Sequence, residues 1–131
     1  MNGTDFRLFY EKYAIYKLAE HLGIPANKIR HLTLKNVTSV ADAEYEGEKY
    51  DIKFAIPTLP NKSKRIAIWD FDLHKRVNGK MVGHYGSNYL ICVGMLKAIP
   101  SKVFIVPTSV APKRHLRISI QGKSKWHQFE I

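Results

Sequence analysis

The fold is decided by residues 42–55, Asp42-Ala-Glu-Tyr-Glu-Gly-Glu-Lys-Tyr-Asp-Ile-Lys-Phe-Ala. At its centre, Glu46-Gly47-Glu48 predicts a tight turn, because glycine adopts positive φ values at little steric cost. Residues 40–46 alternate in character and contain no proline, and residues 49–56 are predicted to form the return strand, which Pro57 ends. Because side chains alternate along a strand, Asp51 and Lys53 share one face of this return strand. The segment therefore predicts a β-hairpin with charged side chains on one face.

A second pair of acidic residues, Asp42 and Glu44, shares one face of the first hairpin strand. If the hairpin brings that face beside Asp51 and Lys53, carboxylates and an ammonium group converge in a small volume. Asp42 is the first candidate for a metal-binding carboxylate on this strand, and Glu44, nearer the turn, is its rival. An ion pair of Asp51 with Lys49 or Lys53 is the simpler alternative, because such pairs are common on exposed strands.

Residues 5–22 have the period of an amphipathic helix, which Gly23 and Pro25 would end. Glu11 lies on the apolar stripe of this helix, where a carboxylate needs a partner, a metal ion or an exit to water. Glu11 is therefore a candidate site acid, with a satisfied boundary residue as the alternative. The apolar stripe and its flanks comprise Leu8, Phe9, Ile15, Tyr16, Leu18, Ala19 and Leu22.

Further segments have strand character. The runs at residues 89–96 and 103–106 are apolar throughout, which is typical of central strands buried on both faces. Residues 29–34 and 66–73 alternate, and Asp70 and Asp72 fall on the polar face of the latter, as metal ligands or simply as solvated residues. Residues 74–87 are polar, basic and rich in glycine, which predicts a long loop or a hairpin tip. The length favours one domain over residues 1–131.

The chain carries 21 Lys and Arg residues against 11 Asp and Glu residues, a formal net charge of +10 at pH 7. An excess of this size favours a polyanionic partner, and a solvated basic surface is the alternative. The aromatic C-terminal tail either stacks on a base or docks onto the core. The candidate nucleic-acid-binding residues form three clusters: Lys62, Lys64 and Arg65; Lys75 and Arg76; and Lys113, Arg114 and Arg117.

Cys92 is the single cysteine and lies in an apolar run, so we expect a buried thiol rather than a disulfide or a cysteine zinc cluster. No apolar run approaches the ~20 residues that a membrane span needs, and no signal peptide is recognisable. These features predict a cytoplasmic protein with no membrane partner.

The hairpin resembles the catalytic hairpin of the PD-(D/E)xK nuclease superfamily. Asp51-Ile52-Lys53 matches the D/E-x-K triplet, and Asp42 matches the upstream aspartate, although Ala41 stands where the superfamily's name has proline. The resemblance extends over roughly residues 5–107. It implies an α/β, restriction-endonuclease-like fold, in which an N-terminal helix packs on a mixed β-sheet. A helix between the third and fourth core strands is usual in that superfamily, and the sequence predicts none here.

The resemblance also implies the function of a metal-dependent endonuclease, which hydrolyses phosphodiester bonds of DNA. Double-stranded DNA is the first expected substrate. Asp42, Asp51 and the carbonyl of Ile52 would hold Mg²⁺, with Mn²⁺ as a substitute. Lys53 would stabilise charge at phosphorus or hold the attacking water, and Glu11 would bind a metal-bound water. A homodimer would follow from the need to cut two strands.

Two further functions fit the same sequence. One is a non-catalytic nucleic-acid-binding protein that has kept the nuclease-like fold and the charge. The other is an interaction protein whose basic faces meet an acidic protein. Cleavage of DNA that requires a divalent metal would distinguish the nuclease from both the nucleic-acid-binding protein and the interaction protein.

Overall fold

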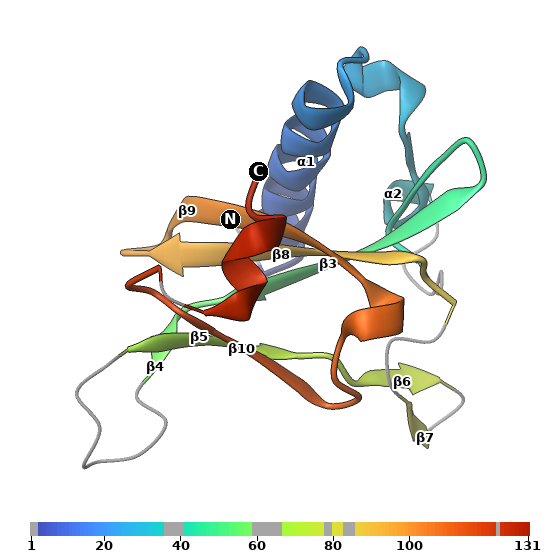
Figure 1. Ribbon diagram of the computed structural model, residues 1–131. Coiled ribbons are helices and arrows are strands. Elements are labelled where there is room, and N and C mark those ends of the chain that lie inside the picture. The colour runs from blue at the N-terminus through green and yellow to red at the C-terminus, as the bar shows by residue number, and fades with distance from the viewer. Residues whose placement is uncertain (1–2, 36–40, 59–66, 78–79, 83–85, 123) are drawn as a thin grey trace.

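The protein is a mixed α/β domain, in which one N-terminal helix and two principal β-sheets are stacked (Figure 1). The computed structural model describes residues 3–35, 41–58, 67–77, 80–82, 86–122 and 124–131. Helix α1 (Gly3–Leu22) lies on one face of a five-stranded sheet, and a three-stranded sheet lies on the other face. Among the described residues, no helix is both long enough and apolar enough to cross a membrane.

The prediction of a helix over residues 5–22 is confirmed, and Gly23 ends it as expected. Gly23 has φ of +70°, and the amide of Ile24 donates to the carbonyl of Ala19 at 3.0 Å, which closes the last turn. The predicted flanks of the apolar stripe are wrong in part, because Phe9 and Tyr16 are 60% and 64% exposed. The stripe that faces the sheet is instead centred on Glu11, Ala14, Ile15, Leu18 and Ala19.

The five-stranded sheet has the order β1-β2-β3-β8-β9. Strands β3 and β8 are parallel, and the other neighbouring pairs are antiparallel. The predicted hairpin is present, with Ala43 opposite Tyr50 and a turn in which Glu46 and Gly47 have φ of 50° and 82°. The strand bounds are β1 (Arg30–His31), β2 (Ala43–Tyr45), β3 (Glu48–Ala55), β8 (Tyr89–Leu96) and β9 (Ile99–Pro107).

The strand predicted over residues 29–34 is only partly correct. Its first half forms the short strand β1, but the chain then turns into a one-turn helix, α2 (Leu32–Lys35). The chain reaches β1 from α1 through the 3₁₀ turn η1 (Ala26–Lys28).

The second sheet has the order β10-β5-β4, with β4 (Pro57–Thr58), β5 (Ile68–Asp72) and β10 (His115–Ser119). It contains the strand predicted within residues 66–73, of which Ile66 lies outside the described residues. The segment predicted as a loop or hairpin tip contains a two-stranded hairpin of β6 (Lys75–Val77) and β7 (Lys80–Val82). The described part of the connection between the parallel strands β3 and β8 is thus made of strands, with no helix in it.

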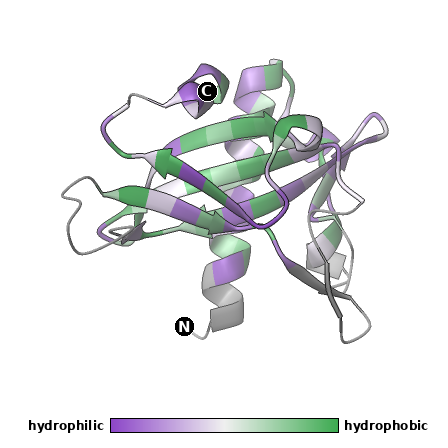
Figure 2. Ribbon diagram, turned by 60° about the horizontal axis from the view of Figure 1, so that its bottom comes forward, coloured by the Kyte–Doolittle hydropathy of each residue, from purple (hydrophilic) through white to green (hydrophobic). Residues whose placement is uncertain are grey.

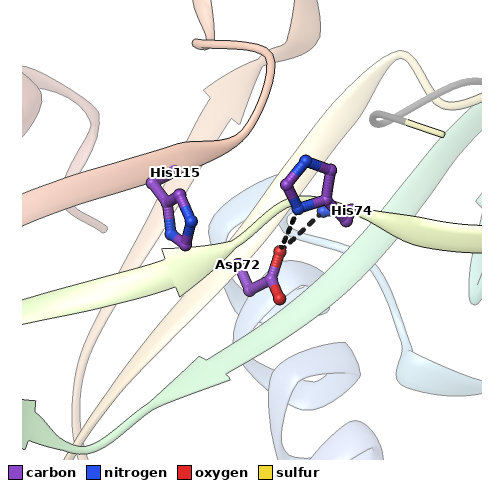
Figure 3. Close-up of side chains that lie close together, drawn as sticks. All are labelled: Asp72, His74 and His115. Atoms are coloured by element: carbon purple, nitrogen blue, oxygen red, sulfur yellow. Dashed lines mark hydrogen bonds and ion pairs between the residues drawn. The ribbon is translucent and has the colours of Figure 1, made fainter. Parts of the chain in front are cut away.

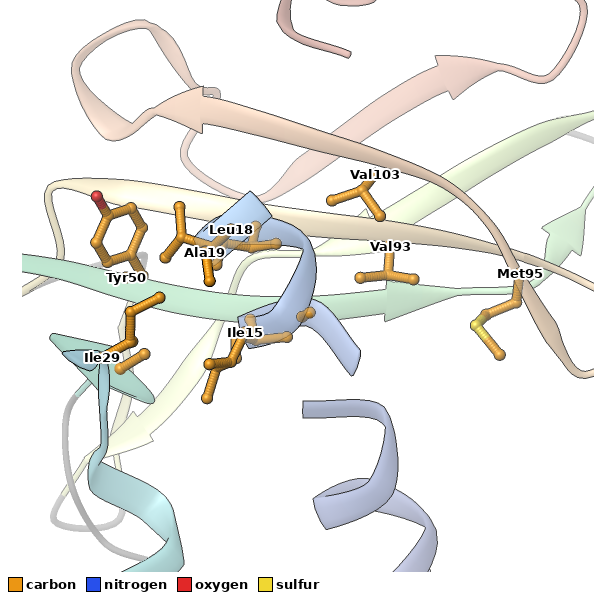
Figure 4. Close-up of a cluster of buried hydrophobic side chains, with 12 residues drawn as sticks. Ile15, Leu18, Ala19, Ile29, Tyr50, Val93, Met95 and Val103 are labelled. Atoms are coloured by element: carbon orange, nitrogen blue, oxygen red, sulfur yellow. The ribbon is translucent and has the colours of Figure 1, made fainter. Parts of the chain in front are cut away.

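Two hydrophobic clusters hold the layers together. The first joins α1 to the five-stranded sheet and includes Ile15, Leu18, Ile52, Val93 and Val103 (Figure 4). The second lies between the two sheets and is built on Trp69, Phe71, Leu90, Cys92, Phe104 and Leu116. Figure 2 shows the hydrophobic residues gathered along the strands that form these layers.

The expectation that Cys92 is a buried thiol is confirmed, since it is fully buried in the second cluster. After the turn η2 (Thr108–Val110) and β10, the chain ends in η3 (Lys125–Phe129). Trp126 on η3 is 8% exposed and packs against the same cluster, so this part of the tail docks onto the core.

Candidate active site

Asp42 lies just before β2 and is held in place by its own backbone. Its amide donates to the carbonyl of Tyr50 at 2.9 Å, and its carbonyl accepts from the amide of Leu32 at 2.8 Å. Its side chain is buried, at 4% residue exposure, and Oδ2 accepts from the amide of Ile52 at 2.7 Å. The hairpin therefore fixes the Asp42 carboxylate against the strand that carries the D-x-K triplet.

Asp51 lies on β3, on the same strand face as Lys53 and away from the apolar face of Tyr50 and Ile52. It is 1% exposed, and the Nζ atom of Lys53 lies 3.5 Å from its Oδ2 atom. The Lys53 side chain is itself 15% exposed. The triplet thus presents a buried carboxylate with a largely buried ammonium group beside it.

The two buried aspartates influence each other's ionisation. Burial, followed by the hydrogen bond to Asp51 and the charge of Asp51, raises the pKa of Asp42 to about 7. With a pKa of about 7, the Asp42 carboxyl group holds a proton for part of the time near neutral pH. Two buried carboxylates pressed together in this way are an arrangement that a bound cation would stabilise.

Glu11 reaches the same region from α1 and is 1% exposed. Its carboxylate accepts hydrogen bonds from Arg7 Nε at 2.7 Å, His31 Nε2 at 2.7 Å and Thr33 Oγ1 at 2.5 Å. Burial alone would raise the pKa of Glu11, but these three donors outweigh burial and hold the pKa below its ordinary value. Glu11 is therefore an ionised, fully engaged carboxylate.

Arg7 joins the helix to the hairpin. Its Nη2 atom lies 3.7 Å from Asp42 Oδ1, while its Nε atom binds Glu11. Burial would lower the pKa of Arg7, but the bond to Glu11 and the charges of Glu11, Asp42 and Asp51 raise it instead. The four residues proposed from the sequence as catalytic thus lie in one connected group, in which Arg7 joins Glu11 to Asp42.

The rival ligand Glu44 lies elsewhere. Its Oε1 atom accepts from Arg30 Nη1 at 2.8 Å, across the β1–β2 pair in which these two residues are direct partners. Its carboxylate is therefore engaged at the edge of the sheet, whereas Asp42 contacts the triplet. The structure thus favours Asp42 over Glu44 as the partner of Asp51.

Sequence reasoning missed Arg7, His31 and Thr33. A signal was present for Arg7, because a residue four positions before Glu11 on a helix lies next to it. No comparable signal exists for His31 and Thr33, which are 20 and 22 residues away along the chain. Their contacts depend on how α1 packs against β1 and α2.

The predicted basic residues are distributed over several segments. Lys113 and Arg114 are exposed just before β10, and Arg117 on β10 is exposed but pairs with Asp70, with Nε 3.3 Å from Oδ2. The backbone of Lys75 and Arg76 lies in β6, next to β5 in the chain. The first predicted cluster, Lys62, Lys64 and Arg65, lies outside the described residues.

The donor set at Asp42 and Asp51 fits Mg²⁺. The two carboxylates and the Ile52 carbonyl are hard oxygen donors, and Mg²⁺ commonly binds through one or two carboxylates while keeping several waters. Within the described part of the chain, three or more ligand atoms of His, Cys, Asp or Glu lie within 4.8 Å of one another only at Asp72, His74 and His115. Glu11 is thus not a third close ligand of this pair.

Comparisons with known proteins found no match to this chain. No family model matches the chain, and no curated protein or solved structure matches it. A functional assignment therefore depends on the residues and on their geometry.

Proposed function

We propose that this protein is a metal-dependent DNA endonuclease of the PD-(D/E)xK type. The observation that carries the proposal is the pair of buried carboxylates Asp42 and Asp51, with Asp42 bound to the amide of Ile52 and Lys53 Nζ 3.5 Å from Asp51. These are the residue types and the order along the hairpin that the superfamily resemblance requires. The net charge of +10 supports a polyanionic substrate.

The fold supports the same proposal at a coarser level. An N-terminal helix packs on a mixed sheet, and the catalytic hairpin β2–β3 lies beside the parallel strand β8. The described part of the segment between β3 and β8 departs from the superfamily's usual pattern, because strands stand where a helix is usual. The contacts described above for Asp42 and Asp51 come from α1, β3 and the segment before β2, and they do not depend on a helix between β3 and β8.

Hydrolysis of a phosphodiester needs an activated water, neutralised charge at phosphorus and a stabilised leaving oxygen. Asp42, Asp51 and the Ile52 carbonyl would hold Mg²⁺, which when bound supplies charge neutralisation and a more acidic water. The amide of Ile52 keeps the Asp42 carboxylate oriented through its 2.7 Å hydrogen bond to Oδ2. Orientation of this kind limits the reorganisation that the site needs during the reaction.

The cations of the site have distinct tasks. Lys53 lies next to Asp51 and would donate to the developing charge on the phosphoryl oxygens or hold the attacking water. The side chain of Arg7 is 53% exposed, so its guanidinium can meet a phosphate from the helix side. Glu11 orients Arg7 through the 2.7 Å bond to Nε. Glu11 therefore acts as a positioning residue in this scheme, rather than through direct metal binding.

The proposal is tested by nicking of supercoiled plasmid with Mg²⁺ or Mn²⁺. Asp51→Asn keeps the size of the side chain but removes a ligand charge, so cleavage should be abolished and metal binding weakened. DNA binding should be kept or tightened, because a negative charge near phosphate is gone. Lys53→Ala should also abolish cleavage, but metal binding, as measured by calorimetry, should be nearly unchanged. Glu11→Gln should reduce cleavage less.

Two matched controls come from the same strand. Lys49 shares the strand face of Asp51 and Lys53 but is exposed, and Glu48 is an exposed carboxylate at the start of β3. Lys49→Ala and Glu48→Gln should cleave at the wild-type rate. Full activity in Asp51→Asn would exclude catalysis at this site.

A non-catalytic nucleic-acid-binding protein is the second candidate, and one observation favours it. Arg7 already contacts Glu11 and lies 3.7 Å from Asp42, so the acidic group is partly neutralised from within the protein. A binding protein of this kind would shift DNA equally with and without Mg²⁺ and would leave plasmid intact. The nicking assay and a binding assay on the same preparation therefore separate the two functions.

A homodimer is the assembly that a double-strand cut favours. The apolar strands within residues 89–106 and the aromatic C-terminal tail are the expected contact surfaces. Strand β8 is paired on both sides and Trp126 is buried, whereas β9 is the edge strand of its sheet. Exposed apolar side chains remain near the β8–β9 turn, where Leu96 and Ile99 are 38% and 65% exposed. We expect light scattering to find a dimer at tens of micromolar with DNA present. A monomer, alone and with DNA, would contradict this expectation.

A further inference from the structure

A second group of polar side chains lies on the three-stranded sheet, far along the chain from the catalytic hairpin (Figure 3). Asp72 ends β5, His74 follows two residues later, and His115 begins β10 directly opposite Asp72. One ligand atom from each of the three residues lies within 4.8 Å of the others. The rings of His74 and His115 are 5.9 Å apart and nearly perpendicular.

Each ligand is oriented by a further contact. The Oδ1 atom of Asp72 accepts from the backbone amide of His74 at 2.9 Å, which fixes the carboxylate over the end of β5. The same oxygen lies 2.9 Å from Nδ1 of His74. The Nδ1 atom of His115 donates to Oδ1 of Asp70 at 2.9 Å, which leaves Nε2 as the metal-binding nitrogen. Arg117 in turn contacts the other oxygen of Asp70.

This last arrangement has a chemical meaning. A histidine that binds a metal through one nitrogen usually donates its other N–H to a carboxylate, which fixes the ring and increases its basicity. Asp70 has that relation to His115, and Arg117 holds Asp70 from the neighbouring strand. An accidental gathering of exposed polar side chains does not require such a supported ring.

We propose that Asp72, His74 and His115 bind a first-row divalent cation such as Zn²⁺, in a site separate from the Asp42–Asp51 pair. Two imidazoles and one carboxylate suit Zn²⁺ and its neighbours far better than Mg²⁺, which prefers oxygen donors. Three protein ligands leave a position for water, because Zn²⁺ is commonly four-coordinate.

The distances are compatible with a small adjustment. Ligand atoms around a tetrahedral Zn²⁺ lie about 3.3 Å apart, since each metal–ligand bond is about 2.0–2.1 Å. The ion would take the place of the proton between His74 Nδ1 and Asp72 Oδ1, which are now 2.9 Å apart. The ligand atoms of the three residues already lie within 4.8 Å of one another, so His115 needs only a small shift that keeps its bond to Asp70.

The position of the site indicates what the ion would do. It would fasten the end of β5 to the start of β10, two strands whose partner residues Asp72 and His115 are 43 positions apart in the sequence. Lys75 and Arg76 follow His74 directly, and Lys113 and Arg114 directly precede His115. The ion would therefore hold together the points at which two basic segments leave the sheet.

The test is a titration of the full chain with Zn²⁺, followed by NMR of the histidine rings and by calorimetry. Of the six histidines, only His74 and His115 should shift as one equivalent binds at this site. His74→Gln and His115→Gln should each weaken this binding at least tenfold, and Asp70→Asn should weaken it about 10–100-fold. The matched control is His21→Gln, which removes an exposed histidine on α1 and should change nothing.

The result is decisive in either direction. Unchanged rings of His74 and His115 at saturating Zn²⁺, or equal Zn²⁺ affinity in the glutamine variants and wild type, would overturn the proposal. A Zn²⁺ equivalent that is lost in Asp51→Asn but kept in His115→Gln belongs to the other site and would also count against it. Because ring shifts are measured on wild-type protein, the test does not depend on the folding of any variant.

Discussion

The buried pair of Asp42 and Asp51 predicts an unusual dependence of stability on pH. Burial and the nearby Asp51 charge raise the pKa of Asp42 from 3.8 to about 7 in the folded protein. Between these values the folded state binds more protons than the unfolded chain, so the free energy of unfolding falls as pH rises. The stabilisation is fully present below about pH 4 and is lost as pH passes about 7.

The magnitude follows from the size of the shift. A displacement of about 3 pKa units corresponds to about 4 kcal/mol, at about 1.4 kcal/mol per unit. Between pH 5 and pH 8.5 only about 2 of these units are covered, which corresponds to at most about 3 kcal/mol. Side-chain relaxation or entry of water would relieve part of this, so we expect a loss of about 1–3 kcal/mol over this interval. Such a loss is a large share of the stability of a domain of this size.

Asp51→Asn isolates this effect from other groups that titrate in the same range, such as the histidines. Asparagine carries no charge and can donate a hydrogen bond to the Asp42 carboxylate, so the variant removes the part of the pKa shift that Asp51 causes. Burial, the largest cause of the raised pKa of Asp42, remains, so the variant should lose about 1 kcal/mol less than wild type over this pH interval. The assay is urea unfolding at several pH values, without divalent metal. Glu48→Gln removes an exposed charge from the same strand and should follow the wild-type curve. Parallel curves for Asp51→Asn and wild type would refute the reasoning.

Two further predictions concern packing and binding. An added Cβ at Gly94 would lie 2.5 Å from the ring of Trp69, which is fully buried and donates to Met95, so Gly94→Ala should cost about 2–3 kcal/mol in urea unfolding. An unchanged free energy of unfolding in Gly94→Ala would show that the Trp69 ring can move aside. Replacing Lys113 and Arg114 with alanine should weaken DNA binding similarly for all sequences and reduce the slope of log affinity against log salt by about 2. An unchanged slope would show that neither Lys113 nor Arg114 contacts the DNA backbone.

The features that the sequence predicted correctly are local ones. The hairpin depends on a turn at Glu46 and Gly47 and on alternation in the strand that follows, both of which act between near neighbours. The position of Glu11 on the buried stripe follows from the helical period alone. The contact between Asp42 and Asp51 then follows from the register of one hairpin.

The features that it missed depend on packing between distant segments. The angle at which α1 lies on the sheet decides that Ala14 is buried and that Phe9 and Tyr16 are not, and no pattern within the helix encodes that angle. The contact of His31 with Glu11 spans 20 residues. The pairing of β5 with β10 brings Asp72 opposite His115, although the two residues belong to segments that are separated by most of the second half of the chain.

The charges of the candidate active site can be balanced in more than one way, and this links its stability to its proposed chemistry. Glu11, Asp42 and Asp51 carry three negative charges when ionised, while Arg7 and Lys53 carry two positive charges. Near neutral pH, a proton on Asp42 supplies the remaining compensation, as its raised pKa requires. A divalent cation would displace that proton and turn the group from neutral to positive. Metal binding would therefore release a proton, tighten as pH rises towards 8, and present a positive site to a phosphate. The same burial that makes the apo pair costly would thus favour both the metal and the polyanionic substrate.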